Sequence, residues 1–344
     1  MIDRRNFIGK SLGIGAGTAL AATVATAAPA MAARKGDDHV PVAGLHTFDT
    51  PKQVKAGLLN VGYAEIGPAN GPVVICLHGY PYGTRSFAVT APLLADRGYR
   101  VIVPYLRGYG TTRFLTADTF RNGQQAALGV DLIAFMDALK INKAVLAGFD
   151  WGTSVACVTA ALWPERCKAI VATTGYAITS LAANLQPASA EVEHNWWYRS
   201  YFATERGRLA MEDPQKRRDL NRLDWQLTSP TVDDAVFDSV AVAFDNPDHA
   251  AIVIHHYRWQ LSIAAGERQY DALEAKLAKL PAITVPSVAL DPDRDPFTPP
   301  GEGASYRNHF TGRYEHRTLK GIGAHVPWEA PVAFADAVMT AARL

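Results

Sequence analysis

Short apolar strand segments alternate with helical segments along most of this chain, and this alternation restricts the folds open to it. Strands are expected at residues 73–77, 100–106, 144–149, 169–173, 283–290 and 315–319. Helices are expected at residues 86–97, 124–139 and 153–163 and from about residue 331 onward. Strands that are apolar throughout are buried on both faces. The pattern therefore predicts an α/β fold with a mostly parallel central β-sheet flanked by helices.

The stretch from residue 177 to residue 280 interrupts the alternation. It is helical, charged and aromatic, and it contains no apolar strand run. We therefore expect a helical cap of roughly a hundred residues, within the usual size of a domain. The cap is expected to be inserted into one sheet domain, which consists of residues 54–176 and 281–344.

The N-terminal segment has the features of an export signal. This segment resembles the twin-arginine motif in the run Asp3-Arg4-Arg5-Asn6-Phe7-Ile8-Gly9-Lys10. A Gly/Ala-rich stretch and two A-x-A cleavage sites follow it. That stretch is short and is broken by glycines, which argues against a membrane anchor. We expect residues 1–32 to be a cleaved signal peptide and residues 33–53 an N-terminal extension. The mature protein is expected to be periplasmic or secreted, with no membrane contact.

Charge and cysteine content exclude several classes of partner. The chain has 34 Lys and Arg against 33 Asp and Glu, a net charge of +1. A nucleic-acid partner would need a basic surface, so the expected partner is a small molecule. Cys76, Cys157 and Cys167 are too few for a four-thiolate zinc site, although one disulfide is possible. No metal and no cofactor are expected, and the oligomeric state is left open.

The segment between the strand at 144–149 and the helix at 153–163 has the spacing of a nucleophile elbow, G-x-Nu-x-G. It reads Gly148-Phe149-Asp150-Trp151-Gly152. Such a tight turn needs small flanking residues, and the nucleophile at its centre is here an aspartate. The alternative is an ordinary turn in which Asp150 is a helix N-cap.

Other parts of a catalytic arrangement follow other expected strands. His78-Gly79-Tyr80-Pro81 follows the strand at 73–77, so the backbone N–H groups of Tyr80 and Trp151 are expected to form an oxyanion hole. Three aspartates at 291, 293 and 295 follow the strand at 283–290, and His325 comes near the C-terminus. The chain order is nucleophile, acid, histidine.

Taken together, the Asp-Trp elbow, the His-Gly-x-Pro loop and the late Asp and His resemble the α/β-hydrolases of the epoxide hydrolase and haloalkane dehalogenase group. The resemblance extends from about Val54 to the end of the chain. It implies the α/β-hydrolase fold with an inserted helical cap. It also implies that Asp295, which is followed by Pro296, is the acid that orients His325, with Asp293 as the second candidate.

An aspartate nucleophile suits displacement at a saturated carbon, because the carboxylate can form an alkyl-enzyme ester. His325 would then take a proton from the water that hydrolyses this ester. An epoxide leaving group also needs O–H donors. Tyr198 and Tyr257 resemble the two cap tyrosines of soluble epoxide hydrolases, which implies that they protonate the epoxide oxygen. The expected substrate is a small apolar epoxide, opened to a vicinal diol.

Two alternatives remain at this point. The same nucleophile could serve a haloalkane or haloacid dehalogenase. For Arg107 a structural role, in which it bonds loop carbonyls, is favoured over binding the carboxylate of a haloacid. A non-catalytic ligand-binding protein on this fold is the other alternative. The residues expected to contact substrate are His78, Phe149, Trp197 and Phe202. Of these, Phe149 stands where epoxide hydrolases most often carry histidine.

Overall fold

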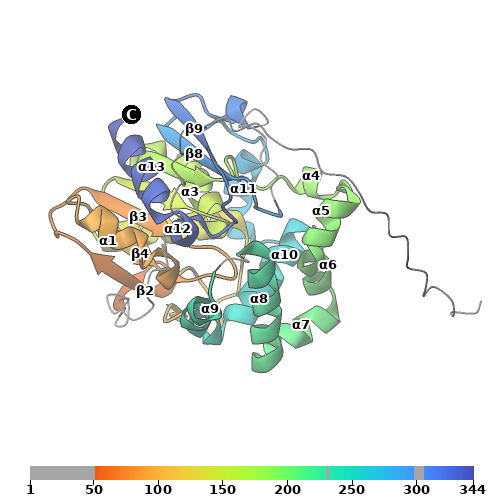
Figure 1. The fold of residues 1–344 in the computed structure, drawn as a ribbon. Helices are drawn as coiled ribbons and strands as arrows, with labels where there is room; N and C mark the ends of the chain where they lie inside the picture. Colours follow the sequence, from red (N-terminus) through yellow and green to blue (C-terminus); the bar gives the residue numbers. More distant parts are fainter. Residues whose placement is uncertain (1–50, 230–231, 298–305) are drawn as a thin grey trace, which may run out of the picture. The chain divides into compact units, whose positions relative to one another are not determined.

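A central β-sheet forms the core of the region that the structure describes (Figure 1). The structure, a computed structural model, describes residues 51–229, 232–297 and 306–344. These residues belong to one unit, Val40–Leu344. The expected signal peptide and the extension up to residue 50 lie outside the described residues. The strands are β1 (Lys52–Ala56), β2 (Leu59–Ile66), β3 (Val73–Leu77), β4 (Arg100–Pro104), β5 (Arg113–Phe114), β6 (Ala144–Gly148), β7 (Cys167–Thr173), β8 (Ser287–Pro292) and β9 (Tyr314–Leu319).

The strand order is β1-β2-β4-β3-β6-β7-β8-β9, and β5 pairs with β2. Neighbours from β4 to β9 are parallel, which confirms the expected mostly parallel sheet. Strand β1 begins at Lys52, two residues before the expected start of the sheet domain at Val54. This strand forms an antiparallel hairpin with β2. The two-residue turn between them is possible because Gly57 adopts a φ of 56°.

Helices cover the sheet in two groups. The helices α2 (Gln125–Ala138) and α3 (Trp151–Leu162) pack against each other, and α3 also contacts β6 and β7. In the other group, α1 (Thr90–Ala95) packs on α13 (Pro331–Arg343), which contacts β7 and β8. The short helix α12 (Val326–Glu329) precedes α13. Single 3-10 turns lie at Thr84–Phe87, Pro164–Arg166, Val242–Asp245, Arg268–Tyr270 and Arg307–His309.

Between β7 and β8 the chain is helical, as Figure 1 shows. The helices are α4 (Leu181–Asn184), α5 (Ala190–Asn195), α6 (Trp197–Ala203), α7 (Glu205–Glu212), α8 (Pro214–Thr228), α9 (Asp234–Ala241), α10 (His249–Gln260) and α11 (Asp271–Leu277). Side-chain N-caps mark where α7 and α8 begin. Thr204 and Asp213 each accept a hydrogen bond from a backbone N–H of the first turn that follows. Such caps satisfy N–H groups that have no partner within the helix.

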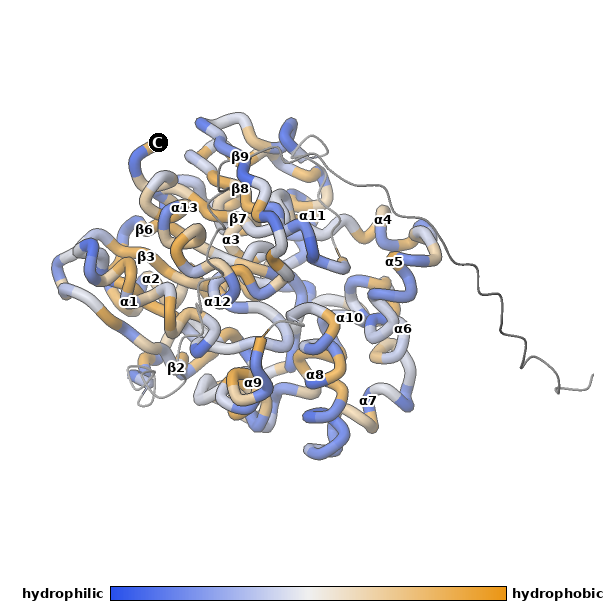
Figure 2. Tube along the Cα trace, viewed as in Figure 1, coloured by the Kyte–Doolittle hydropathy of each residue, from blue (hydrophilic) through white to orange (hydrophobic). Residues whose placement is uncertain are grey.

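The sheet core is strongly apolar, and the central strands are orange in Figure 2. Every residue of β6 is buried, and β3 and β7 are buried along most of their length. The carboxyl ends of parallel strands meet at one edge of the sheet. Tyr80 after β3, Asp150 after β6, Asp295 after β8 and His325 after β9 are thereby brought to the same edge.

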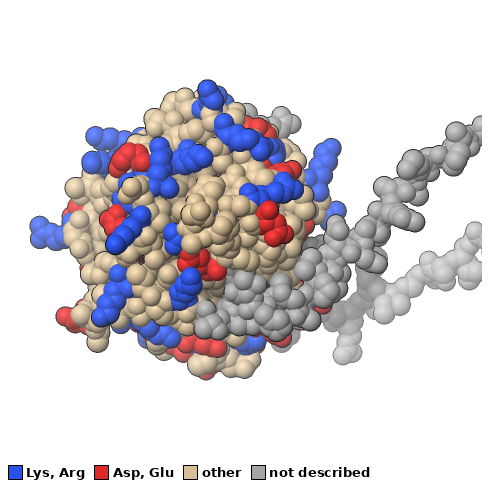
Figure 3. Space-filling view, turned by 90° about the vertical axis from the view of Figure 1, so that its left-hand side faces the viewer, with Lys and Arg blue, Asp and Glu red and all other residues tan. Residues whose placement is uncertain are grey.

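The surface shown in Figure 3 mixes Lys and Arg side chains with Asp and Glu side chains. No helix of the described ranges is long and apolar enough to cross a membrane. The three cysteines are buried free thiols, so the disulfide that the sequence left open is not formed.

Candidate active site

Asp150 stands at the turn between β6 and α3. Its φ of 52° lies in the left-handed region, which costs a non-glycine residue strain and is typical of functional turns. The flanking glycines are needed on steric grounds. A Cβ on Gly148 would lie 2.2 Å from the carbonyl oxygen of Gly152, and a Cβ on Gly152 would lie 1.9 Å from that of Leu77. The tight turn of the elbow excludes a side chain at Gly148, and its close packing onto β3 excludes one at Gly152.

Two backbone amides point at the Asp150 carboxylate. The N–H of Tyr80 donates to Oδ1 over 2.7 Å, and the N–H of Trp151 donates to the same carboxylate. Gly79 permits this approach, because a Cβ there would lie 2.1 Å from Oδ1. These are the two amides expected to form the oxyanion hole. Burial raises the pKa of Asp150 to about 6, although the two hydrogen bonds act in the opposite direction.

The two cap tyrosines lie next to each other within electrostatic reach of this carboxylate, and Tyr257, but not Tyr198, lines the cavity that contains Asp150. Tyr198 on α6 and Tyr257 on α10 have ring centroids 5.4 Å apart. The indole N–H of Trp151 donates to the Tyr257 hydroxyl over 3.4 Å. Burial raises the pKa of both phenols well above 10, and the charge of Asp150 raises it further. Both phenols are therefore protonated at neutral pH and can donate a proton.

The structure gives the three late aspartates different surroundings. Asp291 accepts hydrogen bonds from the side chains of Tyr306 and His316, over 2.5 Å and 2.7 Å. Asp293 is exposed and accepts one from a backbone N–H in the loop after β9. Asp295 is buried. Its burial favours Asp295 over Asp293 as the acid near His325.

His325 is fully buried at the start of α12. Its ring packs on Tyr82, Trp225 and Phe149, with centroid distances of 4.6, 4.9 and 5.4 Å. Neither ring nitrogen has a hydrogen-bond partner among the described residues. Burial lowers the pKa of the ring to about 3, so the imidazole is neutral. No hydrogen bond links His325 to Asp295 in the described part of the chain, so that pairing stays a prediction.

A cavity of about 410 Å³ opens beside Asp150. Five predicted site residues line it: Tyr80, Asp150, Trp151, Tyr257 and Asp295. A carboxylate with two amide donors and a phenol in one cavity can attack a carbon atom and protonate its leaving group. No group of three or more His, Cys, Asp or Glu side chains in the described ranges is arranged to hold a metal ion.

Known proteins with the same features identify the family. A family model for the α/β-hydrolase fold matches residues 72–236. A solved structure from Klebsiella pneumoniae, described provisionally as an epoxide hydrolase, is 49% identical. The match covers 87% of this chain and 99% of that one, with a TM-score of 0.84. The chain belongs to the α/β-hydrolase family, in its epoxide hydrolase group.

More distant relatives of this α/β-hydrolase are also named epoxide hydrolases. Epoxide hydrolase I of potato is 19% identical over 84% of this chain and 98% of that one, with a TM-score of 0.67, which is a likeness of fold. Epoxide hydrolase B of Mycobacterium tuberculosis is 30% identical over 150 residues. This match spans about two fifths of either protein, namely 40% of this chain and 41% of the relative.

The four residues expected to contact substrate do not line the cavity of this α/β-hydrolase. His78 supports the loop after β3: its Nδ1–H donates to Gly79, and its Nε2 accepts the backbone N–H of Leu106. Phe149 and Phe202 are fully buried in the aromatic core, and Trp197 packs on other cap aromatics. Their positions therefore indicate packing and loop support instead of substrate contact.

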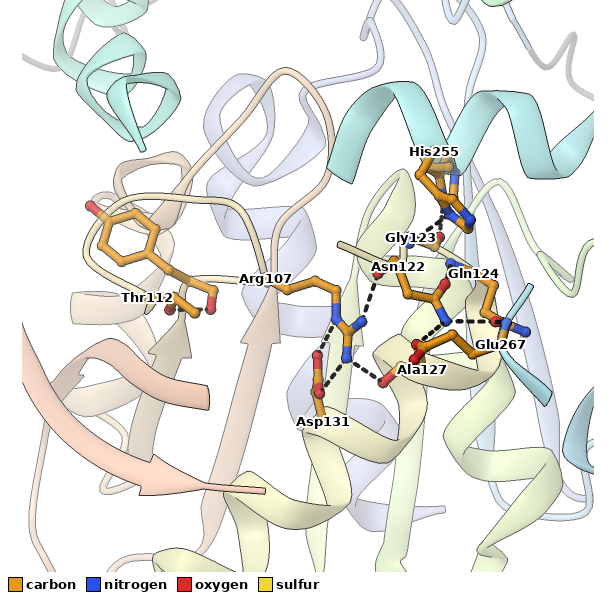
Figure 4. A network of polar contacts seen from close by, with 11 residues as sticks. Arg107, Thr112, Asn122, Gly123, Gln124, Ala127, Asp131, His255 and Glu267 are labelled. Atoms are coloured by element: carbon orange, nitrogen blue, oxygen red, sulfur yellow. Dashed lines mark hydrogen bonds and ion pairs between the residues drawn. The ribbon is translucent and has the colours of Figure 1, made fainter. Parts of the chain in front are cut away.

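Arg107 does not line the cavity either. Figure 4 shows its polar contacts. Its guanidinium forms a two-point ion pair with Asp131, over 2.6 and 2.7 Å, and donates to the Asn122 carbonyl over 2.6 Å. The expected structural role thus fits the position of Arg107. The haloacid alternative therefore loses Arg107 as its carboxylate-binding residue.

Two charged residues near the site were not predicted. Arg199 on α6 lines the cavity. Asp224 on α8 is 1% exposed, and neither of its carboxyl oxygens has a partner among the described residues. Burial raises the pKa of Asp224 well above its usual range, and the charges of Asp150 and Asp295 raise it further. Apolar periodicity gives no signal for Asp224, because the buried face of α8 consists mostly of polar residues.

The Asp224→Asn variant is expected to gain thermal stability over the wild type as pH rises. A carboxyl whose pKa is higher in the folded than in the unfolded state lowers stability above its unfolded pKa. Between the pKa of the unfolded state and that of the folded state, the free energy of unfolding falls by about 1.4 kcal/mol per pH unit. Melting curves at pH 4 and pH 8 should therefore diverge, and the Asn protein should melt several degrees higher at pH 8. Asp219→Asn, an exposed site on the same helix, is the control. Parallel pH dependence of Asp224→Asn and wild type would contradict the expectation.

Proposed function

We propose that this α/β-hydrolase opens an epoxide to a vicinal diol through an ester formed on Asp150. The main support is geometric: the carboxylate at the elbow is held by two backbone amides, and the Tyr257 phenol lines the same cavity. The names of its relatives support the class of substrate.

In the first step, an Asp150 carboxylate oxygen attacks the less hindered epoxide carbon, and the carbon–oxygen bond breaks. The released oxygen takes a proton from Tyr257. Tyr198 lies behind Tyr257 and hydrogen bonds to it, so it can share the developing phenolate charge. The hydrogen bond from the Trp151 indole N–H stabilises the phenolate oxygen of Tyr257.

In the second step, water attacks the ester carbonyl carbon of Asp150, and His325 takes the proton. The amides of Tyr80 and Trp151 stabilise the oxyanion that forms on the Asp150 side chain. The intermediate collapses and the ester carbon–oxygen bond breaks: the leaving diol oxygen takes the proton from His325, the other proton of the attacking water returns through solvent to the Tyr257 phenolate, and Asp150 is left as the free carboxylate. This step requires His325 to reach the ester and Asp295 to orient its ring. The neutral state of the buried imidazole fits a proton acceptor.

Dehalogenation is disfavoured by the same contacts. A leaving halide needs N–H donors that are open to it. The indole N–H of Trp151 is directed to the Tyr257 hydroxyl. The epoxide reaction uses that phenol, whereas halide release does not.

The proposal is tested by trapping the ester. A His325→Gln protein incubated with styrene, alkyl or glycidyl epoxides should gain the mass of the substrate, because the ester forms but is not hydrolysed. Absence of an adduct and of turnover across the panel would refute the proposal. Halide release from haloalkanes that survives Tyr198→Phe combined with Tyr257→Phe would instead show a dehalogenase.

We also propose that the protein is exported by the twin-arginine route, with the leader sequence as the support. Exchange of both Arg4 and Arg5 for Lys is expected to leave the protein in the cytoplasm. Immunoblots of cytoplasmic, periplasmic and medium fractions measure this. Unchanged fractionation of the double variant would contradict it.

A further inference from the structure

Arg199 brings a positive charge to the catalytic cavity. It comes from α6, one residue after Tyr198, and lines the cavity together with Trp196, His256 and Gln260. Its guanidinium carbon lies 4.6 Å from the centre of the Trp196 ring. Arg199 is the one Lys or Arg among the described residues that line this cavity.

This cation has no counter-charge. Among the described residues its guanidinium makes no ion pair and no hydrogen bond, and its Nε is buried without a partner. Two neighbouring cap arginines have polar partners. Arg258 donates to the carbonyls of Phe202 and Thr204, and Arg208 pairs with Glu205. A buried donor without an acceptor is costly, and a bound anion would relieve that cost.

The residues near Arg199 are neutral and polar. Burial lowers the pKa of His256 to about 3, and the charge of Arg199 lowers it slightly further, so the ring carries no charge. Gln260 bonds the Nε2 of His256 over 2.9 Å, and the Asn184 amide donates to the backbone carbonyl of Gln260. Asn184 and Gln260 also line the cavity. They add amide groups beside the cation, and the carboxyl groups that line the cavity are those of Asp150 and Asp295.

We propose that Arg199 binds the carboxylate of the substrate, so that the substrate class is epoxides that carry a carboxylic acid. This inference rests on the proposed epoxide hydrolysis. It replaces the small apolar epoxide expected from the sequence with an amphipathic one. A planar guanidinium matches a carboxylate through two parallel hydrogen bonds, and the single cation beside neutral amides matches a monoanion. The oxirane would then meet Asp150 while the acid group meets Arg199.

The test compares terminal epoxy acids of increasing chain length with their primary amides and with epoxyalkyl phosphates. For the chain length that fits, wild type should prefer the acid over the amide in kcat/KM by about 10–100-fold, mainly through KM. Arg199→Gln should bring the acid-to-amide ratio close to one, and Arg199→Lys should restore part of it. Arg206→Gln removes the same charge from an exposed position on α7 and should keep the wild-type ratio.

The outcomes separate the two proposals. If amides and acids are hydrolysed equally well by wild type, or if Arg199→Gln keeps the acid preference, the assignment of Arg199 fails while epoxide hydrolysis stands. Preference for phosphates over acids would overturn the carboxylate class. If no epoxide of any kind is turned over, the proposed function itself fails.

Discussion

Exchange of Asp150 for asparagine is expected to lower kcat for epoxide opening by on the order of 10⁴-fold, because the variant lacks the nucleophile. Asparagine is the most informative substitution, because it removes the charge with the least change in structure. It nearly matches aspartate in shape and tolerates the left-handed backbone of the elbow, so the fold should survive. Steady-state diol formation measures the loss, and thermal melting checks the fold. In the His325→Gln background the same change should remove the covalent adduct.

Asp150→Ala provides the matched control. It removes the side chain that both amides hold, whereas the asparagine variant still offers a carbonyl oxygen to them. Both variants should be inactive if the carboxylate is the nucleophile. Retention of more than about a tenth of kcat in the asparagine protein would assign Asp150 a supporting role instead.

The ionisation of Asp150 should also show in the pH profile. Burial raises its pKa to about 6, and only the carboxylate form attacks. Below that pH, kcat/KM should fall about tenfold per unit. Loss of the tyrosine protons should not lower it up to pH 9, because both phenols have a pKa well above 10. A profile that stays flat down to pH 5 would contradict an ionisable nucleophile with a raised pKa.

The elbow could be predicted from sequence because steric limits leave few residue types at each position. Gly148 and Gly152 face backbone atoms closely enough to exclude any Cβ. The nucleophile between them follows a strand of apolar residues that is easy to recognise. Its partners Tyr80 and Asp295 follow other strands of the same parallel sheet. Sheet topology then brings them to one edge without further information.

The lining of the cavity could not be predicted, because it depends on how the cap helices pack. Nearly all of α10 is buried, so periodicity does not show which face of this helix meets the sheet. Phe202 was expected at the substrate and is core, whereas Gln260 was not expected and lines the cavity. The residue type does not decide the position, because an aromatic residue on a cap helix can lie in the core or at the cavity.

Charged cap residues are hard to place from the sequence for a related reason. The charged run Lys216-Arg217-Arg218 is typical of a solvated helix face, yet Arg217 is buried and donates to the Met211 carbonyl. Asp224 is a stronger case: a carboxyl without a partner is expected on the surface, and here it lies within electrostatic reach of Asp150. Such positions are costly for stability, and they occur most often where a site needs them.

Replacing Arg107 by methionine is expected to lower the free energy of unfolding by about 3–5 kcal/mol. Arg107 is 1% exposed, and its removal leaves the carboxylate of Asp131 without its partner and the carbonyl of Asn122 without its donor (Figure 4). Arg107→Lys keeps the charge but cannot form both contacts at once, so it should lose part of this stability. Urea unfolding at equilibrium measures each difference.

The double variant Arg107→Met with Asp131→Leu separates the ion pair from simple packing. A buried charge is most costly when its partner alone is removed, and replacing both partners by apolar side chains is often close to neutral. The double variant should therefore recover much of the stability that Arg107→Met loses. A single variant within about 1 kcal/mol of wild type would show that Asp131 finds solvent instead. A double variant less stable than the single one would assign the loss to packing around the aliphatic part of Arg107.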